Sequence, residues 1–323
     1  MTNIAINGFG RIGRIFFRQV FERKDFDIIA INDLGAPDNL KYLLKYDTVY
    51  GKYDKDISSV KFFQEKDPAK LPWKDLGIDV VVESTGVFET SEKAKAHLDA
   101  GAKRVVISAP TKDDITPMAT PNVGMAALSE SKITSTASCT TNCVNPVVSI
   151  LMQSIGIKKA MLNTIHGYTA TQGLVDVLGG KDFRRGRAAA QNIVPSTTGA
   201  AKATTRVIPD LKNKFDGIAI RVPVSAGSII DFTFTSGKPT TVEEVNGIFK
   251  KACASPQWDG IIAYNEEQIV SSDILGNTHG SIFDATLTKV VDGDLVKVFA
   301  WYDNEWGYCS MLIKHLQEVA KLL

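Results

Sequence analysis

The chain has 323 residues, of which 44% are hydrophobic and 23% charged, and its formal net charge at pH 7 is +1. A single core rarely grows beyond about 250–300 residues, so this length favours two domains. The charge balance gives no sign of nucleic acid or of an anionic membrane surface, and no apolar run reaches the length of a membrane span. Four cysteines in a chain this long form no disulfide framework. They predict a cytoplasmic protein, and their spacing predicts no metal site.

The first 33 residues predict a dinucleotide site. A short apolar strand at 4–6 runs into Gly8-Phe9-Gly10-Arg11-Ile12-Gly13, and a helical pattern follows. The next strand, 27–32, ends at Asp33, 20 residues after Gly13. Gly8, Gly10 and Gly13 would allow a tight turn close to a pyrophosphate, which a helix N-terminus then binds. Asp33 would accept hydrogen bonds from the ribose hydroxyls and repel a 2′-phosphate, so NAD is predicted rather than NADP.

The remaining patterns in the first half alternate between strands and helices. Further strands are predicted at 79–83 and 104–108, and helices at 39–46 and from Ser91, as N-cap, to Gly101. Repeated strand–helix–strand units predict a parallel sheet with helices on both faces. His97, in the middle of a helix between lysines, is predicted to be a surface residue.

The second half predicts a different kind of sheet. Apolar and polar residues alternate at 218–222, 230–235 and 296–301, which indicates an antiparallel or mixed sheet with one covered face. Helices at about 199–208, 242–253 and 306–322 are expected to cover it. The domain boundary is expected just before Cys139.

Five features are candidates for chemistry. Cys139 lies among small, hydroxyl-bearing residues that favour a reactive thiolate, although an ordinary small buried cysteine fits the residues alone. His166 ends an apolar strand beside Gly167, as a general base or as a structural histidine. Anion contacts are candidates in the basic run 181–187, in the hydroxyl-rich helix start 196–201 and at Arg221. Their alternatives are a solvated or intersubunit loop, plain N-capping and an ordinary salt bridge.

Together these features resemble the glyceraldehyde-3-phosphate dehydrogenase family from residue 3 to residue 308. The motifs that carry the resemblance are separate and in the same order: Asn7-Gly8-Phe9-Gly10-Arg11-Ile12-Gly13-Arg14, Leu44-Lys45-Tyr46-Asp47, Glu83-Ser84-Thr85-Gly86, Ala137-Ser138-Cys139-Thr140-Thr141-Asn142-Cys143, His166-Gly167-Tyr168-Thr169, Arg184-Arg185 with Arg187, Pro195-Ser196-Thr197-Thr198-Gly199-Ala200 and Tyr302-Asp303-Asn304-Glu305-Trp306-Gly307-Tyr308.

The resemblance implies an α/β protein of two domains. Residues 1–138 would form an NAD-binding Rossmann domain with a doubly wound, mostly parallel sheet, onto which the helix 306–323 packs. Residues 139–305 would form an α+β catalytic domain with a mixed or antiparallel sheet. The implied activity is the NAD-dependent, phosphorylating oxidation of D-glyceraldehyde 3-phosphate to 1,3-bisphosphoglycerate in glycolysis or gluconeogenesis. The family is homotetrameric, and the segment 168–193 would reach a neighbouring subunit.

The resemblance also implies residue roles. Cys139 would be the nucleophile, carrying a thioester that inorganic phosphate attacks, and His166 the general base. The substrate's phosphate would meet Thr169 and Arg221, with Arg185 as a contributor. The attacking phosphate would meet Ser138, Thr140, Thr198 and Gly199. The cofactor contacts implied beyond the glycines are Arg11, Ile12, Asp33, Lys66, Ser108 and Asn304.

Three segments depart from the family pattern. Residues 119–125 replace a Met-Gly-Val-Asn segment, and Lys66 stands where arginine is common. Val144-Asn145-Pro146 replaces Leu-Ala-Pro, and the preference of proline for N1 predicts a helix that begins at Pro146, whereas the resemblance begins it near Cys139. The alternatives that remain are an erythrose 4-phosphate dehydrogenase, a cysteine hydrolase and a non-catalytic NAD-binding protein.

Overall fold

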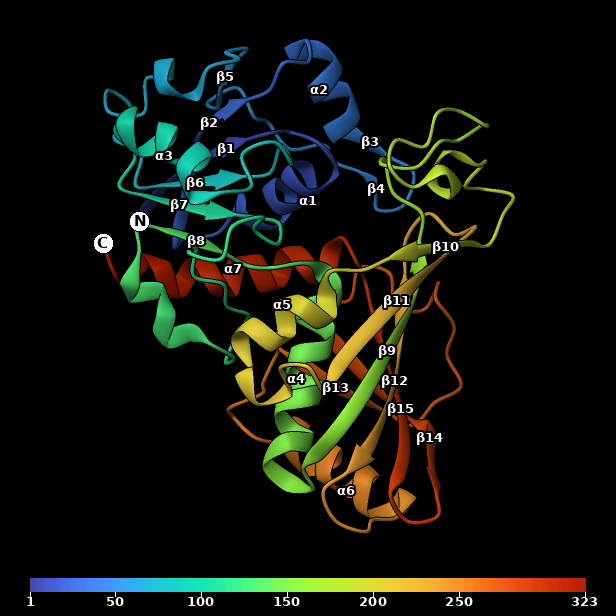
Figure 1. Cartoon of the computed structure of the whole chain (residues 1–323). Helices are drawn as coiled ribbons and strands as arrows, with labels where there is room; N and C mark the ends of the chain where they lie inside the picture. The colour runs from blue at the N-terminus through green and yellow to red at the C-terminus, as the bar shows by residue number, and fades with distance from the viewer. The chain divides into compact units, whose positions relative to one another are not determined.

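The computed structural model describes all residues, 1–323, and they form two compact units. Unit 1 contains residues 1–138 and 309–323, and unit 2 contains residues 139–308. Each unit has a sheet of its own (Figure 1). None of the helices combines the length and the apolar character that a bilayer span requires.

Unit 1 is built on a six-stranded sheet in the order β5-β2-β1-β6-β7-β8, in which every pairing is parallel. Its strands are β1 (Thr2–Asn7), β2 (Phe26–Asn32), β5 (Lys61–Phe63), β6 (Val80–Glu83), β7 (Arg104–Ile107) and β8 (Ile133–Ser135). Its helices are α1 (Arg11–Val20), α2 (Pro37–Lys45), α3 (Ser91–Asp99) and, from residue 309 onward, α7 (Trp306–Ala320), and β3 (Tyr46–Asp47) pairs with β4 (Gly51–Lys52). The strand order reverses at β1 and β6, where doubly wound sheets bind ligands beyond the strand ends. The predicted parallel sheet is confirmed.

Helix α3 corrects two predictions. Its N-cap is Thr90 rather than Ser91, because the Thr90 side chain accepts a hydrogen bond from Lys93 N at 3.3 Å. His97 is fully buried rather than on the surface. Its Nδ1 accepts from Trp73 Nε1 at 3.0 Å and its Nε2 lies 3.1 Å from Glu83 Oε2. His97 thereby joins Asn7 and Thr85, which donate hydrogen bonds to the same buried carboxylate.

Unit 2 is built on a seven-stranded mixed sheet in the order β10-β11-β9-β12-β15-β14-β13. Its strands are β9 (Ile157–Gly167), β10 (Val194–Thr197), β11 (Phe215–Val222), β12 (Ser228–Ser236), β13 (Ile262–Asn265), β14 (Ser281–Val291) and β15 (Leu295–Tyr302). The pairs β9–β11 and β13–β14 are parallel and the others antiparallel. The predicted mixed sheet is therefore confirmed.

Helices α4 (Cys139–Ser154), α5 (Ala200–Val207) and α6 (Val242–Cys253) pack on this sheet (Figure 1). α4 contacts β9, β12, β14 and β15, with α5 beside it on β11. The prediction that a helix at 306–322 covers the sheet is wrong, because residues 309–323 group with unit 1. Helix α4, which the sequence analysis did not count among the helices that cover this sheet, packs on it instead.

Helix α4 also decides where the cysteine lies. It begins at Cys139 and contains Pro146 in its interior, so the prediction that Pro146 is its first residue is wrong. An interior proline removes one helical hydrogen bond and costs about 3 kcal/mol or more. Every residue from Thr140 to Val148 is buried, and this burial offsets the cost. Before the helix, Ala137 has a φ of 59°, a left-handed conformation that turns the chain from β8 into α4.

Candidate functional site

Cys139 and His166 meet in unit 2. Cys139 opens α4 and His166 is the penultimate residue of β9, and Cys139 Sγ lies 3.4 Å from His166 Nε2. Burial raises the pKa of the Cys139 thiol, while Arg221, the Thr140 hydroxyl and the N–H groups of Thr140 and Cys139 act to lower it. Because the helix begins at Cys139, the N–H groups of Cys139 and Thr140 in its first turn reach the sulfur. The arrangement is that of a nucleophile and its base.

Arg221 lies on the other side of the imidazole. In the parallel pairing of β11 with β9, Arg221 is the partner of His166, so both side chains project from the same face of the sheet. Arg221 Nη1 is 2.7 Å from His166 Nδ1. Burial first, and then the charge of Arg221, lowers the pKa of His166 to about 3, so the imidazole is neutral at pH 7 in the ligand-free chain.

The face of β11 that carries Arg221 is the covered one. Arg221 projects to the same side as Ala219, which is 1% exposed, whereas Ile218 is 50% exposed. Ile218, Ile220 and Val222 lie on the opposite face of β11, whereas the buried residues Phe215 and Ala219 lie on the covered face. Period-2 alternation therefore predicts this strand but does not tell which of its two faces is covered.

Tyr302 is a site residue for which the sequence analysis assigned no role. Its hydroxyl lies 2.8 Å from Thr140 Oγ1 and 2.7 Å from Thr164 Oγ1, and its ring packs edge-on against the His166 ring. Burial raises the pKa of the Tyr302 phenol, which therefore stays protonated. Tyr302 continues the alternation of Val296, Val298 and Ala300, and that pattern would have placed it on the inward face.

The residues predicted for the substrate's phosphate are linked by a threonine that the sequence analysis missed. Thr171 Oγ1 lies 2.9 Å from Thr169 Oγ1 and accepts from Arg185 Nη2 at 2.5 Å. The charge of Arg185 acts on both His166 and Arg221, which places it near them. Arg221 Nε is buried without a hydrogen-bond partner. Three polar side chains and an unsatisfied guanidinium nitrogen form a site suited to an anion.

The residues predicted for the attacking phosphate lie at two helix starts. Ser138 and Thr140 flank Cys139, while Thr198 and Gly199 precede α5, where Thr198 Oγ1 accepts from Ala200 N at 3.2 Å. Asn145 explains one departure from the family pattern. It is fully buried and accepts from Thr204 Oγ1 at 2.8 Å, so it joins α4 to α5. This bond fixes the two helices relative to each other.

Asn304, one of the predicted cofactor contacts, is held in place by hydrogen bonds to its side-chain oxygen. Asn304 Oδ1 accepts from Gly227 N and from Ser228 Oγ, both at 3.0 Å. Ser228 Oγ also accepts from Gly167 N at 3.3 Å, which connects this amide to the residue after His166. With its oxygen engaged, Asn304 presents its NH₂ group as the donor for a ligand.

In unit 1 the glycine-rich turn follows β1 and opens α1. Gly8 has a φ of 95°, and a Cβ there would lie 2.6 Å from Thr85 N. A Cβ on Gly13 would lie 2.2 Å from Gly8 O, whereas nothing lies within 4 Å of a Cβ on Gly10. Gly8 and Gly13 therefore permit backbone contacts inside the fold, and Gly10 leaves space at the helix N-terminus. That cradle fits a pyrophosphate.

Gly13→Ala is expected to lower the thermal unfolding midpoint of the cofactor-free protein, because overpacking against backbone costs about 1–3 kcal/mol. Gly10→Ala is the matched control. It should leave that midpoint nearly unchanged and weaken NAD binding, because its methyl group would occupy the space left for the pyrophosphate. Thermal unfolding without NAD and an NAD titration measure the two effects. Equal midpoints for the two variants would contradict this division of roles.

The other predicted cofactor residues surround the same strand ends. Asp33 Oδ2 accepts from Phe9 N at 2.6 Å and its Oδ1 from Gly35 N at 2.8 Å, so the carboxylate is fixed against the glycine-rich turn. Ser108 directly follows β7, and its N–H donates to Glu83 O at 2.9 Å. Lys66 is exposed and follows Glu65, whose backbone forms two hydrogen bonds with the Asn32 side chain.

Arg11 and Ile12 open helix α1, and Arg11 forms an ion pair with Asp47 at 2.5 Å.

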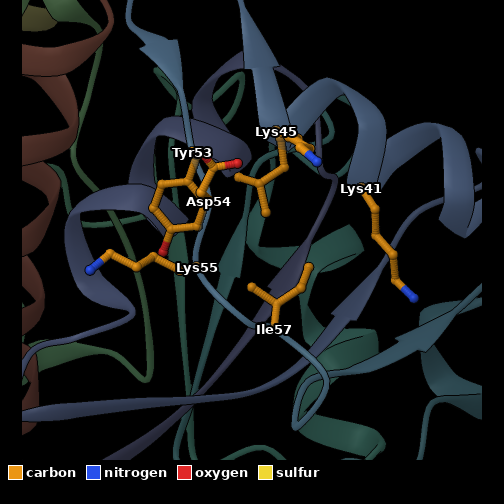
Figure 2. A pocket seen from close by; sticks show the side chains of 7 residues that line it. Lys41, Lys45, Tyr53, Asp54, Lys55 and Ile57 are labelled. Atoms are coloured by element: carbon orange, nitrogen blue, oxygen red, sulfur yellow. The ribbon is translucent and has the colours of Figure 1, made fainter.

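A pocket of about 220 Å³ in unit 1 contains none of the predicted site residues. It is lined by Lys41, Leu44, Lys45, Tyr53, Asp54, Lys55 and Ile57. Figure 2 shows the ammonium groups of Lys41 and Lys55 at opposite ends of the pocket, and Lys55 pairs with Glu22 at 2.9 Å. Its cations do not converge on one point, so the pocket is not a candidate anion site.

Comparisons with known proteins agree with this geometry. Residues 2–91 match the family model described as the NAD binding domain of glyceraldehyde 3-phosphate dehydrogenase, and residues 138–304 match the model of its C-terminal domain. The chain is 51% identical over 336 residues to the glyceraldehyde-3-phosphate dehydrogenase of Thermotoga maritima, with 100% of both chains covered. It is 46% identical over 323 residues to that of Streptomyces coelicolor, covering 96% of each chain. It is 46% identical over 333 residues to that of Podospora anserina, covering 99% of this chain and 98% of the relative. The chain therefore belongs to the glyceraldehyde-3-phosphate dehydrogenase family.

Proposed function

We propose that the chain oxidises D-glyceraldehyde 3-phosphate to 1,3-bisphosphoglycerate in glycolysis or gluconeogenesis, with NAD and inorganic phosphate, through a thioester on Cys139. The observation that carries the proposal is the 3.4 Å approach of Cys139 Sγ to His166 Nε2 at the start of α4. A thiolate there attacks the aldehyde carbon, and the C–S bond forms as the carbonyl π electrons move to the oxygen, which takes up the proton that the thiol released and becomes a hydroxyl. His166 Nε2 takes the hydroxyl proton as the carbon loses hydride. NAD, when bound, supplies the acceptor for that hydride.

The thioester is then cleaved by inorganic phosphate, whose oxygen forms the new bond to carbon as Cys139 Sγ leaves. The N–H of Cys139, at the helix start, supports the charge on the carbonyl oxygen. Ser138, Thr140, Thr198 and Gly199 hold the attacking phosphate, while Thr169, Arg185 and Arg221 hold the phosphate of the substrate. Gly8, Gly10, Arg11, Ile12, Gly13, Asp33, Lys66, Ser108 and Asn304 are the proposed NAD contacts.

Two substitutions separate the anion sites. Arg221→Ala is expected to raise KM for the aldehyde phosphate by about 10- to 150-fold, because a charge-assisted bond contributes about 1.5–3 kcal/mol. Thr198→Ala is expected to raise KM for inorganic phosphate by about 2- to 10-fold, because it removes one neutral hydrogen bond. Initial rates with each substrate varied in turn measure both constants. If both variants change only the aldehyde constant, the division of the sites is wrong.

The activity itself is tested by NADH formation from glyceraldehyde 3-phosphate with and without inorganic phosphate, using NAD and NADP in parallel. Turnover should require both phosphate and NAD. A higher specificity constant for erythrose 4-phosphate would overturn the substrate assignment, and hydrolysis without NAD would favour a cysteine hydrolase.

We also propose that the chain acts as a cytoplasmic homotetramer. The segment 168–193 exposes several large apolar side chains, among them Leu174, Leu178 and Phe183, and the outer face of the unit 2 sheet exposes Met161 and Ile218. Exposed apolar side chains of this number favour a subunit interface. Sedimentation at micromolar concentration tests the proposal, and a monomer would contradict it.

A further inference from the structure

The two ring nitrogens of His166 have different neighbours, and Nδ1 has two. Nδ1 lies 2.6 Å from Gly167 O and 2.7 Å from Arg221 Nη1. A neutral imidazole nitrogen either donates or accepts. A proton on Nδ1 would satisfy Gly167 O but face the N–H of Arg221, whereas a lone pair on Nδ1 would accept from Arg221 but face the carbonyl oxygen. The two contacts therefore require different tautomers.

The contact with Arg221 decides between them. A hydrogen bond from a cation is about twice as strong as a neutral one, and a guanidinium cannot act as acceptor. Arg221 Nη1 also lies 3.1 Å from Gly167 O, so it satisfies the carbonyl that Nδ1 would leave unpaired. The ring proton then resides on Nε2 and points at Cys139 Sγ, 3.4 Å away. In this tautomer Nε2 supports a thiolate but cannot accept a proton.

Arg221 is free to be drawn away by a stronger ligand. Its Nε is buried without a partner, and the hydrogen bonds of its Nη1 go to His166 Nδ1 and Gly167 O rather than to a carboxylate. A phosphate dianion offers the bidentate partner that the guanidinium lacks. Thr169, Thr171 and Arg185 mark where it would bind.

We propose that Arg221 is a positioning residue that holds His166 in the Nε2–H tautomer, and that a phosphate-bearing substrate frees the base by drawing Arg221 off Nδ1. This inference rests on the proposed function. After Arg221 leaves, Nδ1 takes up a proton from solvent and donates a hydrogen bond to Gly167 O, while Nε2 releases its own proton to solvent, so the number of bound protons is unchanged. Nε2 then carries the lone pair that accepts the hydroxyl proton. An aldehyde without a phosphate leaves the base blocked.

The test is ¹⁵N NMR of the four histidine rings in NAD-loaded protein, with the His166 signals assigned by their loss in His166→Asn. Without glycerol 3-phosphate, the NAD-loaded wild type should show the proton on Nε2. Saturation with glycerol 3-phosphate, which has no aldehyde to react, should move the proton to Nδ1, whereas glycerol should not. Arg221→Ala should show the Nδ1–H form without any ligand.

Arg185→Ala is the matched control, because it removes a nearby arginine that does not contact Nδ1, and it should keep the Nε2–H form. A proton on Nδ1 in the ligand-free wild type, or on Nε2 at saturating glycerol 3-phosphate, would overturn the proposal. The titration of the wild type decides the matter even if Arg221→Ala does not fold. NADH formation by the wild type reports separately on the proposed function, so the two failures are distinguishable.

Discussion

Replacing Cys139 by serine is expected to lower kcat by about 10⁴- to 10⁶-fold, the range found when a covalent nucleophile is removed. The hydroxyl keeps the size and the hydrogen bonds of the thiol, but its proton is far harder to remove. The N–H groups at the start of α4 and the charge of Arg221 lower the thiol pKa against the effect of burial, and they cannot bring an alcohol into the neutral range. Single-turnover NADH formation measures the loss.

Cys143→Ser is the matched control, because Cys143 lies one helical turn further along α4. Its thiol is fully buried, its Sγ lies 3.5 Å from Ser281 Oγ, and burial raises its pKa beyond the normal range. This variant should keep the activity. Iodoacetamide should label Cys139 well before Cys143. Equal labelling rates, or turnover retained in Cys139→Ser, would disprove the covalent mechanism.

The sequence predicted the elements of the fold better than the faces they bury. The glycine-rich turn, Asp33 and the alternating strands predicted a parallel and a mixed sheet, because backbone geometry fixes those patterns locally. Which side of β11 is covered depends on what packs against it. Ile218 is exposed although it is apolar, and Arg221 is inside although it is charged. Neither fact follows from period-2 alternation, since both faces of this strand contain apolar residues.

Long-range packing also overrode two local rules. The preference of proline for N1 placed the start of α4 at Pro146, but burial of the preceding turns outweighed the lost hydrogen bond. His97 sits between lysines on a helix, yet it lies against Glu83 and Trp73 from distant parts of the chain. The sequence shows Glu83 at the end of a predicted strand, but it does not show that His97 contacts this carboxylate.

The candidate site came mainly from the family motifs, and the structure adds the contacts between them. Cys139 and His166 are 27 residues apart in sequence, and only the fold brings their side chains within 3.4 Å. Thr171 and Tyr302 connect predicted residues to one another, and no motif assigned them a role. Side chains that act through a neighbour carry little sequence signal, because their position depends on the geometry of that neighbour.

His166→Asn is expected to lower kcat by about 10²- to 10⁴-fold, the usual contribution of a general base.

The same change should alter the pH dependence of the free energy of unfolding. The pKa of His166 falls from an unfolded value near 6.5 to about 3, so the unfolded chain binds more protons between these values. The stability that this neutral histidine contributes is present above pH 6.5 and is lost as the pH falls toward 3. The wild type should therefore lose up to about 1.4 kcal/mol more per pH unit than His166→Asn between about pH 6 and pH 4. Urea unfolding across this range measures the difference. Parallel curves for the two proteins would show that folding does not lower the pKa of His166. A faster loss of stability in the variant would show that folding raises it.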